Sequence, residues 1–199
     1  AHARLSEQAW DEAGKPDNTR VLYSAHGLPE TIIKKGDSYQ WQVEQTVAQV
    51  NARLPEHLQN HEICFQSRVG PLKWIGPSTE EAIERACQDD KHILLTPIAF
   101  VSEHIETLVE LDYEYRLIAD EAGAPAYIRA PALGVSEGYV ETLADLVDAA
   151  LANGYPARRC QHTRDDIKRG PLVGHLELVA RLCQALYCRV EPLHQNGVC

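Results

Sequence analysis

The sequence contains no methionine, although translation begins with one. We therefore expect the chain to be a processed product or a fragment of a longer protein. Its first residues, AHARLSEQAW, are polar and lack the apolar segment of a secretory signal peptide. No apolar run reaches the length needed to span a bilayer. These absences favour a cytoplasmic protein.

Basic residues are scarce. Lys and Arg together number 19 against 29 Asp and Glu, which gives a formal net charge of −10. No basic arm or patch stands out, so nucleic acid is not expected as a partner. Cysteines are also few and scattered, which excludes a disulfide scaffold in a chain of this length and indicates a reducing compartment.

Apolar runs typical of strands alternate with amphipathic helical patterns. Strands are expected at residues 20–25, 62–66, 92–100 and 126–130. Helices are expected at 6–13, 38–54 and 136–152. Two further helices are expected between the strands: one begins at residue 78 or 79, and the acidic one after the third strand ends at about residue 122. This alternation predicts an α/β fold, with a parallel sheet and helices on both faces. We divide the chain into the end of a preceding helix with a linker (1–19), the sheet domain (20–153) and a C-terminal tail with a helix (154–199).

No Lys or Arg occurs between His92 and Tyr115, and acidic residues recur there. On an α-helix, Glu103, Glu106, Glu110 and Glu114 would fall within about 80° of one face. Asp112 lies on the other side and is expected to pair with Arg116. A row of like charges is either a solvated face or a path for cations.

Other polar and aromatic residues follow the expected strands. His26 comes after the first strand, Ser67, Arg68 and Trp74 after the second, and Phe100 after the third. Ligands of parallel sheets bind outside the carboxyl ends of the strands, so these side chains should converge. Imidazole and carboxylate suit Fe²⁺, Mn²⁺, Co²⁺ or Zn²⁺. A line of such ligands suggests delivery of a metal rather than permanent binding.

Four segments carry a family resemblance: SAHGLP (24–29), GDSY (36–39), QSRVGPLKWIGPSTEE (66–81) and PIAFVSEHIETLVELDYEY (97–115). They resemble the ferrochelatases of the proteobacterial and mitochondrial type, which are lyases that insert Fe²⁺ into protoporphyrin IX to form haem. Those enzymes have two Rossmann-like halves, and the resemblance covers only the second, C-terminal one. It implies a chelatase half-domain whose partner is the missing N-terminal half.

The resemblance also implies roles for individual residues. His26 and Glu106 would face each other across the porphyrin centre, and either could be the catalytic base. The metal ligands would be His26, Glu106, Glu110 and Glu114, the last three on a partly π-type helix. Trp74 and Phe100 would border the macrocycle, and Ser67 and Arg68 would lie where a propionate is held.

Several alternatives stay open. Some ferrochelatases carry a [2Fe–2S] cluster on C-terminal cysteines. Here Cys160, Cys183, Cys188 and Cys199 would be its ligands, or they simply pack a helix. The protein could instead be a half-size cobalt or nickel chelatase of sirohydrochlorin-type rings that forms a homodimer, or a non-catalytic metal- or porphyrin-binding fragment. Because the substrate is hydrophobic, peripheral contact with the inner membrane is a further alternative.

Overall fold

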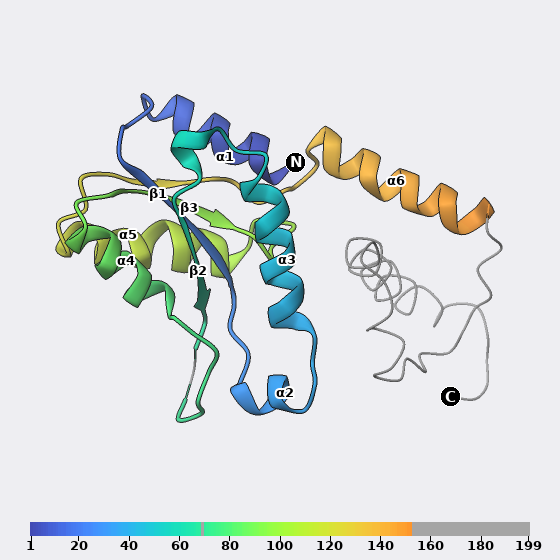
Figure 1. Ribbon diagram of the computed structural model, residues 1–199, viewed down its shortest axis with the longest axis horizontal. Helices are drawn as coiled ribbons and strands as arrows, with labels where there is room; N and C mark the ends of the chain where they lie inside the picture. Colours follow the sequence, from blue (N-terminus) through green and yellow to red (C-terminus); the bar gives the residue numbers. More distant parts are fainter. Residues whose placement is uncertain (69, 153–199) are drawn as a thin grey trace. The chain divides into compact units, whose positions relative to one another are not determined.

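The computed structural model describes residues 1–68 and 70–152 (Figure 1). The chain divides into two compact units, Ala1–Tyr139 and Val140–Cys199. The first holds the sheet and all but one of the described helices. The proposed tail, 154–199, lies outside the described residues, so the domain boundaries remain a prediction.

The sheet has four parallel strands, as the sequence predicts, and their order is β2-β1-β3-β4. The strands are β1 (Thr19–His26), β2 (His61–Gln66), β3 (His92–Pro97) and β4 (Tyr127–Arg129). In the register, His26 is level with Gln66, and Ser24 is level with Pro97. The carboxyl ends of β1, β2 and β3 therefore meet at one edge of the sheet.

The helices follow the expected alternation, with two short additions. They are α1 (His2–Glu12), α2 (Glu30–Lys34), α3 (Tyr39–Asn51), the 3₁₀ turn η1 (Glu56–Leu58), α4 (Thr79–Gln88), the π-helix η2 (Glu106–Glu114), α5 (Tyr115–Glu121) and α6 (Glu137–Ala152). The sequence analysis missed α2 and η1 because each is too short to show a helical period. Ser78 caps α4 in a capping box with Glu81, as its position predicts.

Strand β3 ends at Pro97, before the predicted Phe100. The apolar run continues beyond the strand because Ile98 and Phe100 are buried in the following turn, at 6% and 7% exposure. The Ile98 N–H donates to the Ser24 carbonyl, which ties this turn to β1. A continuous apolar run therefore did not distinguish a strand from a buried turn.

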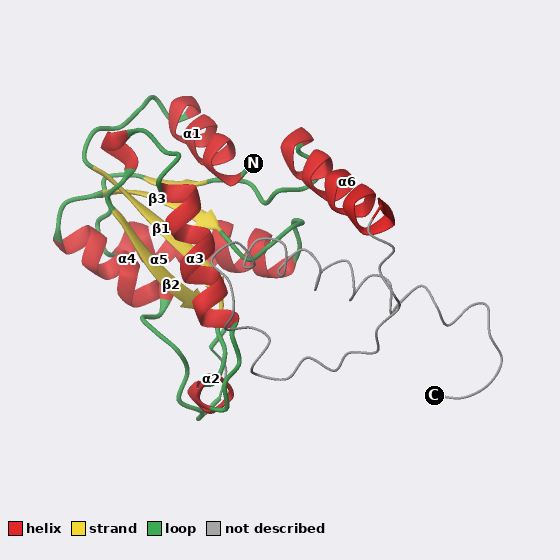
Figure 2. Cartoon of the chain, turned by 45° about the vertical axis from the view of Figure 1, so that its right-hand side comes forward, coloured by secondary structure: helices red, strands yellow, loops and turns green. Residues whose placement is uncertain are grey.

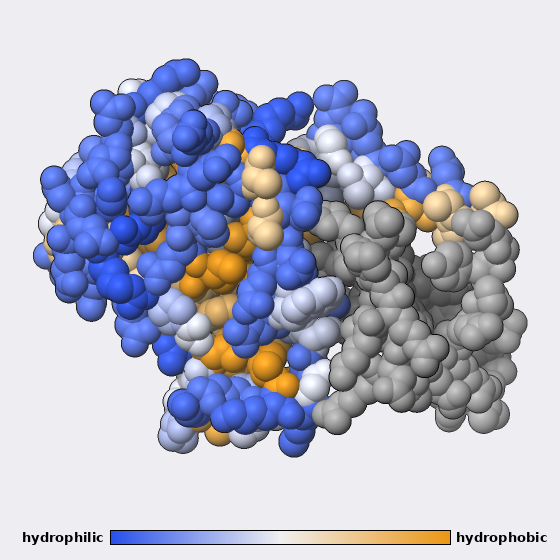
Figure 3. All heavy atoms as spheres, viewed as in Figure 1, coloured by the Kyte–Doolittle hydropathy of each residue, from blue (hydrophilic) through white to orange (hydrophobic). Residues whose placement is uncertain are grey.

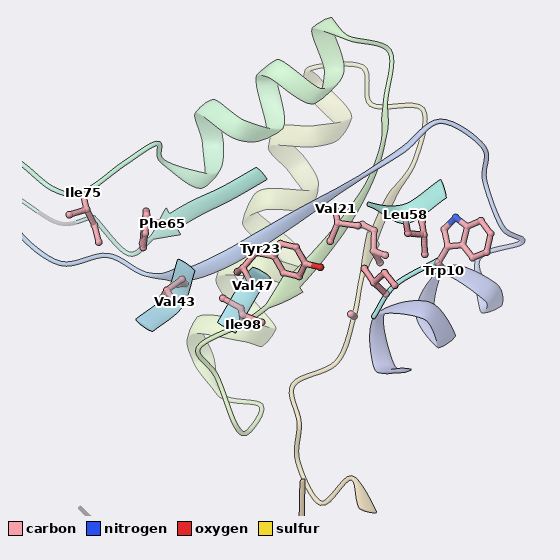
Figure 4. Packing of buried hydrophobic residues seen from close by; sticks show 13 residues of the cluster. Trp10, Val21, Tyr23, Val43, Val47, Leu58, Phe65, Ile75 and Ile98 are labelled. Carbon is pink, nitrogen blue, oxygen red and sulfur yellow. The ribbon is translucent and has the colours of Figure 1, made fainter. Parts of the chain in front are cut away.

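Side chains on the two faces of the sheet belong to separate cores. On one face, Val21 and Tyr23 of β1 pack with Trp10 of α1 and with Val43 and Val47 of α3 (Figure 4). On the other face, the core is formed with α4, η2 and α5; its members are Leu22, Cys64, Ala82, Ile83, Ala86, Ile93, Leu95, Leu111, Tyr115, Ala119 and Tyr127. Helices therefore cover both faces, as Figure 2 shows, and the predicted fold class is confirmed.

Strand β2 pairs only with β1 and forms an edge of the sheet. In the view of Figure 3, apolar side chains show between α4 and α3, within a surface that is otherwise mainly hydrophilic.

Helix α6 carries exposed Val140, Val147 and Leu151. Among the described helices, none combines the length and the apolar character that crossing a membrane requires.

Candidate active site

His26 is the last residue of β1 and lies at the carboxyl edge of the sheet. Its Nδ1 is 2.8 Å from the Gly27 carbonyl oxygen. Because a carbonyl can only accept, Nδ1 carries the proton in the neutral ring, and Nε2 keeps its lone pair. The Tyr39 hydroxyl donates to the His26 carbonyl over 2.9 Å. Burial raises the pKa of Tyr39 to about 12, so this hydroxyl stays a donor at neutral pH.

Glu106 is the first residue of η2, and its Oε1 lies 3.8 Å from Nε2 of His26. This distance is too long for a direct hydrogen bond. The two side chains are 41% and 38% exposed. The structure thus brings an imidazole and a carboxylate together at an accessible position, from the end of β1 and the start of η2.

Gly27 lies against the loop that follows β2. A Cβ atom added at Gly27 would be 2.9 Å from the Gln66 carbonyl oxygen, 3.2 Å from Cγ of Arg68 and 3.3 Å from Cε3 of Trp74. Trp74 forms an antiparallel bridge with Pro29, which holds the two loops side by side. Arg68 and Trp74 are therefore neighbours of the His26 loop, as the sequence analysis expected.

Ser67 lies next to the π-helix, and its polar groups are engaged within the protein. Its N–H and its Oγ both donate to the carboxylate of Glu110, over 2.8 and 2.6 Å. Arg68 has a looser contact, with 3.9 Å between Nη1 and Oε2 of Glu81. Of these two residues, only Arg68 retains donors that can turn toward a bound anion.

The prediction that four carboxylates share one face of an α-helix is wrong in two respects. Residues 106–114 form a π-helix, which the resemblance did imply, and Glu103 precedes it. The Glu103 carboxylate accepts from Nη1 of Arg129 and from the Ala132 N–H, each over 2.8 Å. Burial opposes its ionisation, but the hydrogen bonds from Arg129, Thr107 and Ala132 prevail and lower the pKa of Glu103.

Asp112 also has a different partner from the expected Arg116. Its carboxylate accepts two bonds from Arg129 of β4, one of them from Nη2 over 2.7 Å. Arg116 donates instead to the backbone carbonyl of Asp112. Arg129 is thus an anchor for both the turn before η2 and η2 itself, because it holds Glu103 and Asp112 together.

Two further candidate residues, Phe100 and Glu114, have no described contact with the loop that follows His26. Phe100 is buried, and its ring centroid lies 5.3 Å from that of His104. Glu114 is exposed at the end of η2. Within residues 1–68 and 70–152, no three His, Cys, Asp or Glu side chains converge closely enough to hold a metal ion. The four candidate ligands in this part of the chain therefore form the His26–Glu106 pair, a hydrogen-bonded carboxylate at Glu110 and an exposed carboxylate at Glu114, rather than a cage.

The cysteines expected as cluster ligands, Cys160, Cys183, Cys188 and Cys199, lie outside the described residues. The two described cysteines, Cys64 and Cys87, are free thiols. Burial raises the pKa of Cys64 to about 12, so its thiol stays protonated. Cys64 therefore acts as a core residue of β2.

Three residues near the site were not singled out from the sequence: Gln66, Tyr115 and Arg129. Gln66 is fully buried and donates to both the Glu106 carbonyl and the Glu110 carboxylate. A polar residue that ends an apolar strand could have marked it. Tyr115 and Arg129 make contacts that depend on the fold, and no sequence spacing indicates them.

Comparison with known proteins gives a consistent result. The family model "Ferrochelatase" matches residues 1–151. The ferrochelatase of Caulobacter vibrioides (strain NA1000 / CB15N) is 56% identical over 147 residues, which are 74% of this chain and 42% of that protein. That of Phenylobacterium zucineum (strain HLK1) is 54% identical over 151 residues, covering 76% of this chain and 44% of the relative.

Among solved structures, a CbiX protein assigned to cobalamin (vitamin B12) biosynthesis, from Marinobacter aquaeolei VT8, matches with a TM-score of 0.50 at 14% identity. The match covers 68% of this chain and 98% of that one, and it supports the fold alone. The chain spans less than half the length of the curated relatives given above. By its sequence over residues 1–151, the chain belongs to the ferrochelatase family.

Proposed function

We propose that the full-length protein encoded by this gene inserts Fe²⁺ into protoporphyrin IX, and that this chain supplies the metal side of its active site. The observation that carries the proposal is the pairing of His26 with Glu106 at the carboxyl edge of the sheet, in a chain of the ferrochelatase family. The chain spans less than half the length of its relatives. We assign it to the C-terminal half because its motifs resemble those of that half.

The reaction replaces two pyrrole protons by one Fe²⁺ ion, so the products are haem and two protons. A base beside the ring centre must take each proton as a nitrogen lone pair turns to the metal. Nε2 of His26 is suited to this step because Nδ1 is already committed to the Gly27 carbonyl. The Glu106 carboxylate can stabilise the imidazolium that forms, or accept a proton itself.

The porphyrin would lie against the loops around Gly27. Trp74 offers an aromatic surface beside this glycine. Phe100, whose ring packs against that of His104, would border the macrocycle as the resemblance implies. Arg68, whose side chain is 30% exposed, is the candidate for a propionate carboxylate. The remaining wall of the porphyrin site would come from the part of the enzyme that this chain does not contain.

Iron would arrive along the π-helix side of the pair. Glu114 is exposed on η2, and within the described part of the chain its carboxylate makes no hydrogen bond or ion pair. Such a carboxylate can exchange the waters of a hydrated ion one at a time before the ion reaches Glu106. The apolar product also supports peripheral membrane contact of a cytoplasmic enzyme.

The test is anaerobic haem formation by the full-length gene product from Fe²⁺ and protoporphyrin IX. We expect turnover with this pair, and little with Co²⁺ or Ni²⁺ and sirohydrochlorin. The reverse preference would assign the protein to the sirohydrochlorin-type chelatases. Porphyrin binding with no insertion of any of these metals would make it a binding protein.

A further inference from the structure

The carboxylate of Glu110 is saturated with hydrogen bonds. It accepts from the Ser67 N–H, the Ser67 Oγ, Nε2 of Gln66 and the Tyr115 hydroxyl, at distances from 2.6 to 3.1 Å. A carboxylate has about four acceptor positions, so a metal could bind only by displacing one of these donors. Glu114, one helical turn further along, has none of these contacts.

The donors around Glu110 are fixed by burial. Gln66 is 0% exposed and Tyr115 is 3% exposed. The Gln66 amide has a defined orientation because its Oε1 accepts from the Ser24 hydroxyl over 2.8 Å, which directs Nε2 toward η2. Burial and the nearby charge of Glu110 raise the pKa of Tyr115, so its hydroxyl stays a donor.

The same network reaches both members of the His26–Glu106 pair. Nε2 of Gln66 also donates to the backbone carbonyl of Glu106 over 3.0 Å, and Gln66 is level with His26 in the sheet register. Ser67, the next residue, has φ of +58°, a backbone conformation that non-glycine residues rarely adopt. Its two bonds to Glu110 hold that conformation.

We propose that Glu110 is a positioning residue: with Gln66 it clamps η2 to the end of β2 and so sets the Glu106 carboxylate against His26. This inference rests on the proposed function and assigns Glu110 a different role from the metal ligand that the resemblance implies. A shift at the Glu106 carbonyl would move its own carboxylate relative to His26. A displacement of about 1 Å can lower a rate by about 100-fold.

The first measurement is hydrogen exchange on the 199-residue chain, without iron or porphyrin. Glu110→Gln keeps the side chain's size but turns an NH₂ group toward existing donors. We expect amides in 105–115 and at Ser67 to exchange about 10-fold faster or more. Glu114→Gln, the same change on the same helix, should leave them within about two-fold. Unchanged exchange in Glu110→Gln would overturn the clamp.

The second measurement is steady-state kinetics of the full-length gene product, at a temperature where circular dichroism shows each variant folded. Glu110→Gln should lower kcat by about 10- to 100-fold and leave the KM for iron within about two-fold. Glu121→Gln, an exposed change on α5, serves as the matched control for general effects. A raised KM for iron at normal kcat in Glu110→Gln would make Glu110 a metal ligand and refute the proposal.

Gln66→Met supplies a second variant, which removes the Nε2 donor to the Glu110 carboxylate and to the Glu106 carbonyl. If the clamp is one unit, the double variant Gln66→Met/Glu110→Gln should lose no more kcat than the more severe single variant. Additive losses would show two independent contributions and contradict the clamp. If wild-type protein forms no haem, the proposed function fails, while the exchange measurement still decides the clamp.

Discussion

His26 and Glu106 come from distant segments of the chain, and Nε2 of one lies 3.8 Å from Oε1 of the other. The parallel sheet produces this relationship because β1 and β3 both end at the same edge. The turn after β3 then leads into η2, whose first residue is Glu106. A hydrogen bond from Nδ1 to the Gly27 carbonyl orients the imidazole and leaves Nε2 on the side of the carboxylate.

The first prediction concerns this pair in the full-length protein. His26→Ala should lower the kcat of haem formation by about 100-fold or more, because a positioned base typically contributes that much. Glu106→Gln should have a similar effect without a change in side-chain size. Fluorescence titration with protoporphyrin IX should give a Kd within about three-fold of wild type, since in the proposed arrangement neither side chain would hold a propionate. Near-normal turnover in His26→Ala would refute its central role.

The second prediction concerns the close approach at Gly27. A methyl group there would meet the Gln66 carbonyl oxygen at 2.9 Å, and this backbone atom is held in the sheet. Gly27→Ala should therefore destabilise the chain by about 1–3 kcal/mol, as overpacking usually does. Urea denaturation measures the change. Gly138→Ala is the control, because no atom beyond its chain neighbours and its own helix backbone lies within 4 Å of the added methyl group. Equal stability of the two variants would contradict the packing account.

The third prediction concerns Arg129, whose side chain is 11% exposed and binds two carboxylates. Arg129→Met should leave Glu103 and Asp112 without their partner and cost about 2–3 kcal/mol. This is less than for a fully buried pair because each carboxylate is 32% exposed. Lys34→Met removes an exposed ion pair with Glu30 and should have a much smaller effect, because exposed ion pairs contribute little to stability. Similar losses in both variants would argue against an anchoring role for Arg129.

Much of the fold could be predicted from the sequence, because apolar strand runs and helical periods are local signals. The rule that ligands bind at the carboxyl ends of parallel strands also places His26, Arg68 and Trp74 in one neighbourhood from the sequence alone. The row of carboxylates was partly wrong because it assumed an α-helix from Glu103 onward. In the structure, a turn precedes η2, and Glu103 turns to Arg129.

The missed contacts are those that only the tertiary structure creates. Asp112 has Arg116 at ordinary helical spacing, yet Arg129 on β4 takes its carboxylate. The local pair was the reasonable expectation, but a partly buried carboxylate gains more from a bidentate guanidinium than from an exposed neighbour. Gln66 shows the same limit, since its partners at η2 are distant in sequence.

The fourth prediction is a pH dependence of stability from His2. Burial, aided by the charged amino terminus, lowers the pKa of His2 from 6.5 to about 4. Between pH 6.5 and about 4, His2 is protonated in the unfolded chain but stays neutral in the folded chain. The free energy of unfolding should therefore fall as pH drops from 6.5 to 4, by up to about 3 kcal/mol from this group.

His2→Asn should remove this part of the pH dependence. Denaturation of wild-type and variant chains at several pH values between 4 and 7.5 checks it, because carboxylate titrations are common to both and cancel in the difference. The difference in unfolding free energy should shift in favour of the variant as pH falls. A difference that does not change with pH would show that His2 titrates alike in the folded and unfolded chains.

The last prediction is that the 199-residue chain, made alone, forms haem at no more than a background rate. A porphyrin is a large apolar plate, and binding it firmly requires contact on both faces. This chain offers Trp74 and the His26–Glu106 pair, which amount to one side. Held there alone, the ring could tilt away from the base. Orientation can contribute about 7–11 kcal/mol to lowering a barrier, so losing part of it would be decisive.

The measurement is anaerobic haem formation from Fe²⁺ and protoporphyrin IX, with the full-length gene product as the positive control. Sedimentation of the 199-residue chain should accompany it, because a homodimer could close the site with a second copy. Turnover close to that of the full-length protein, carried by a dimer, would contradict the prediction. It would show that one half suffices when it is paired, and would favour the half-size chelatases as the better functional model for this chain.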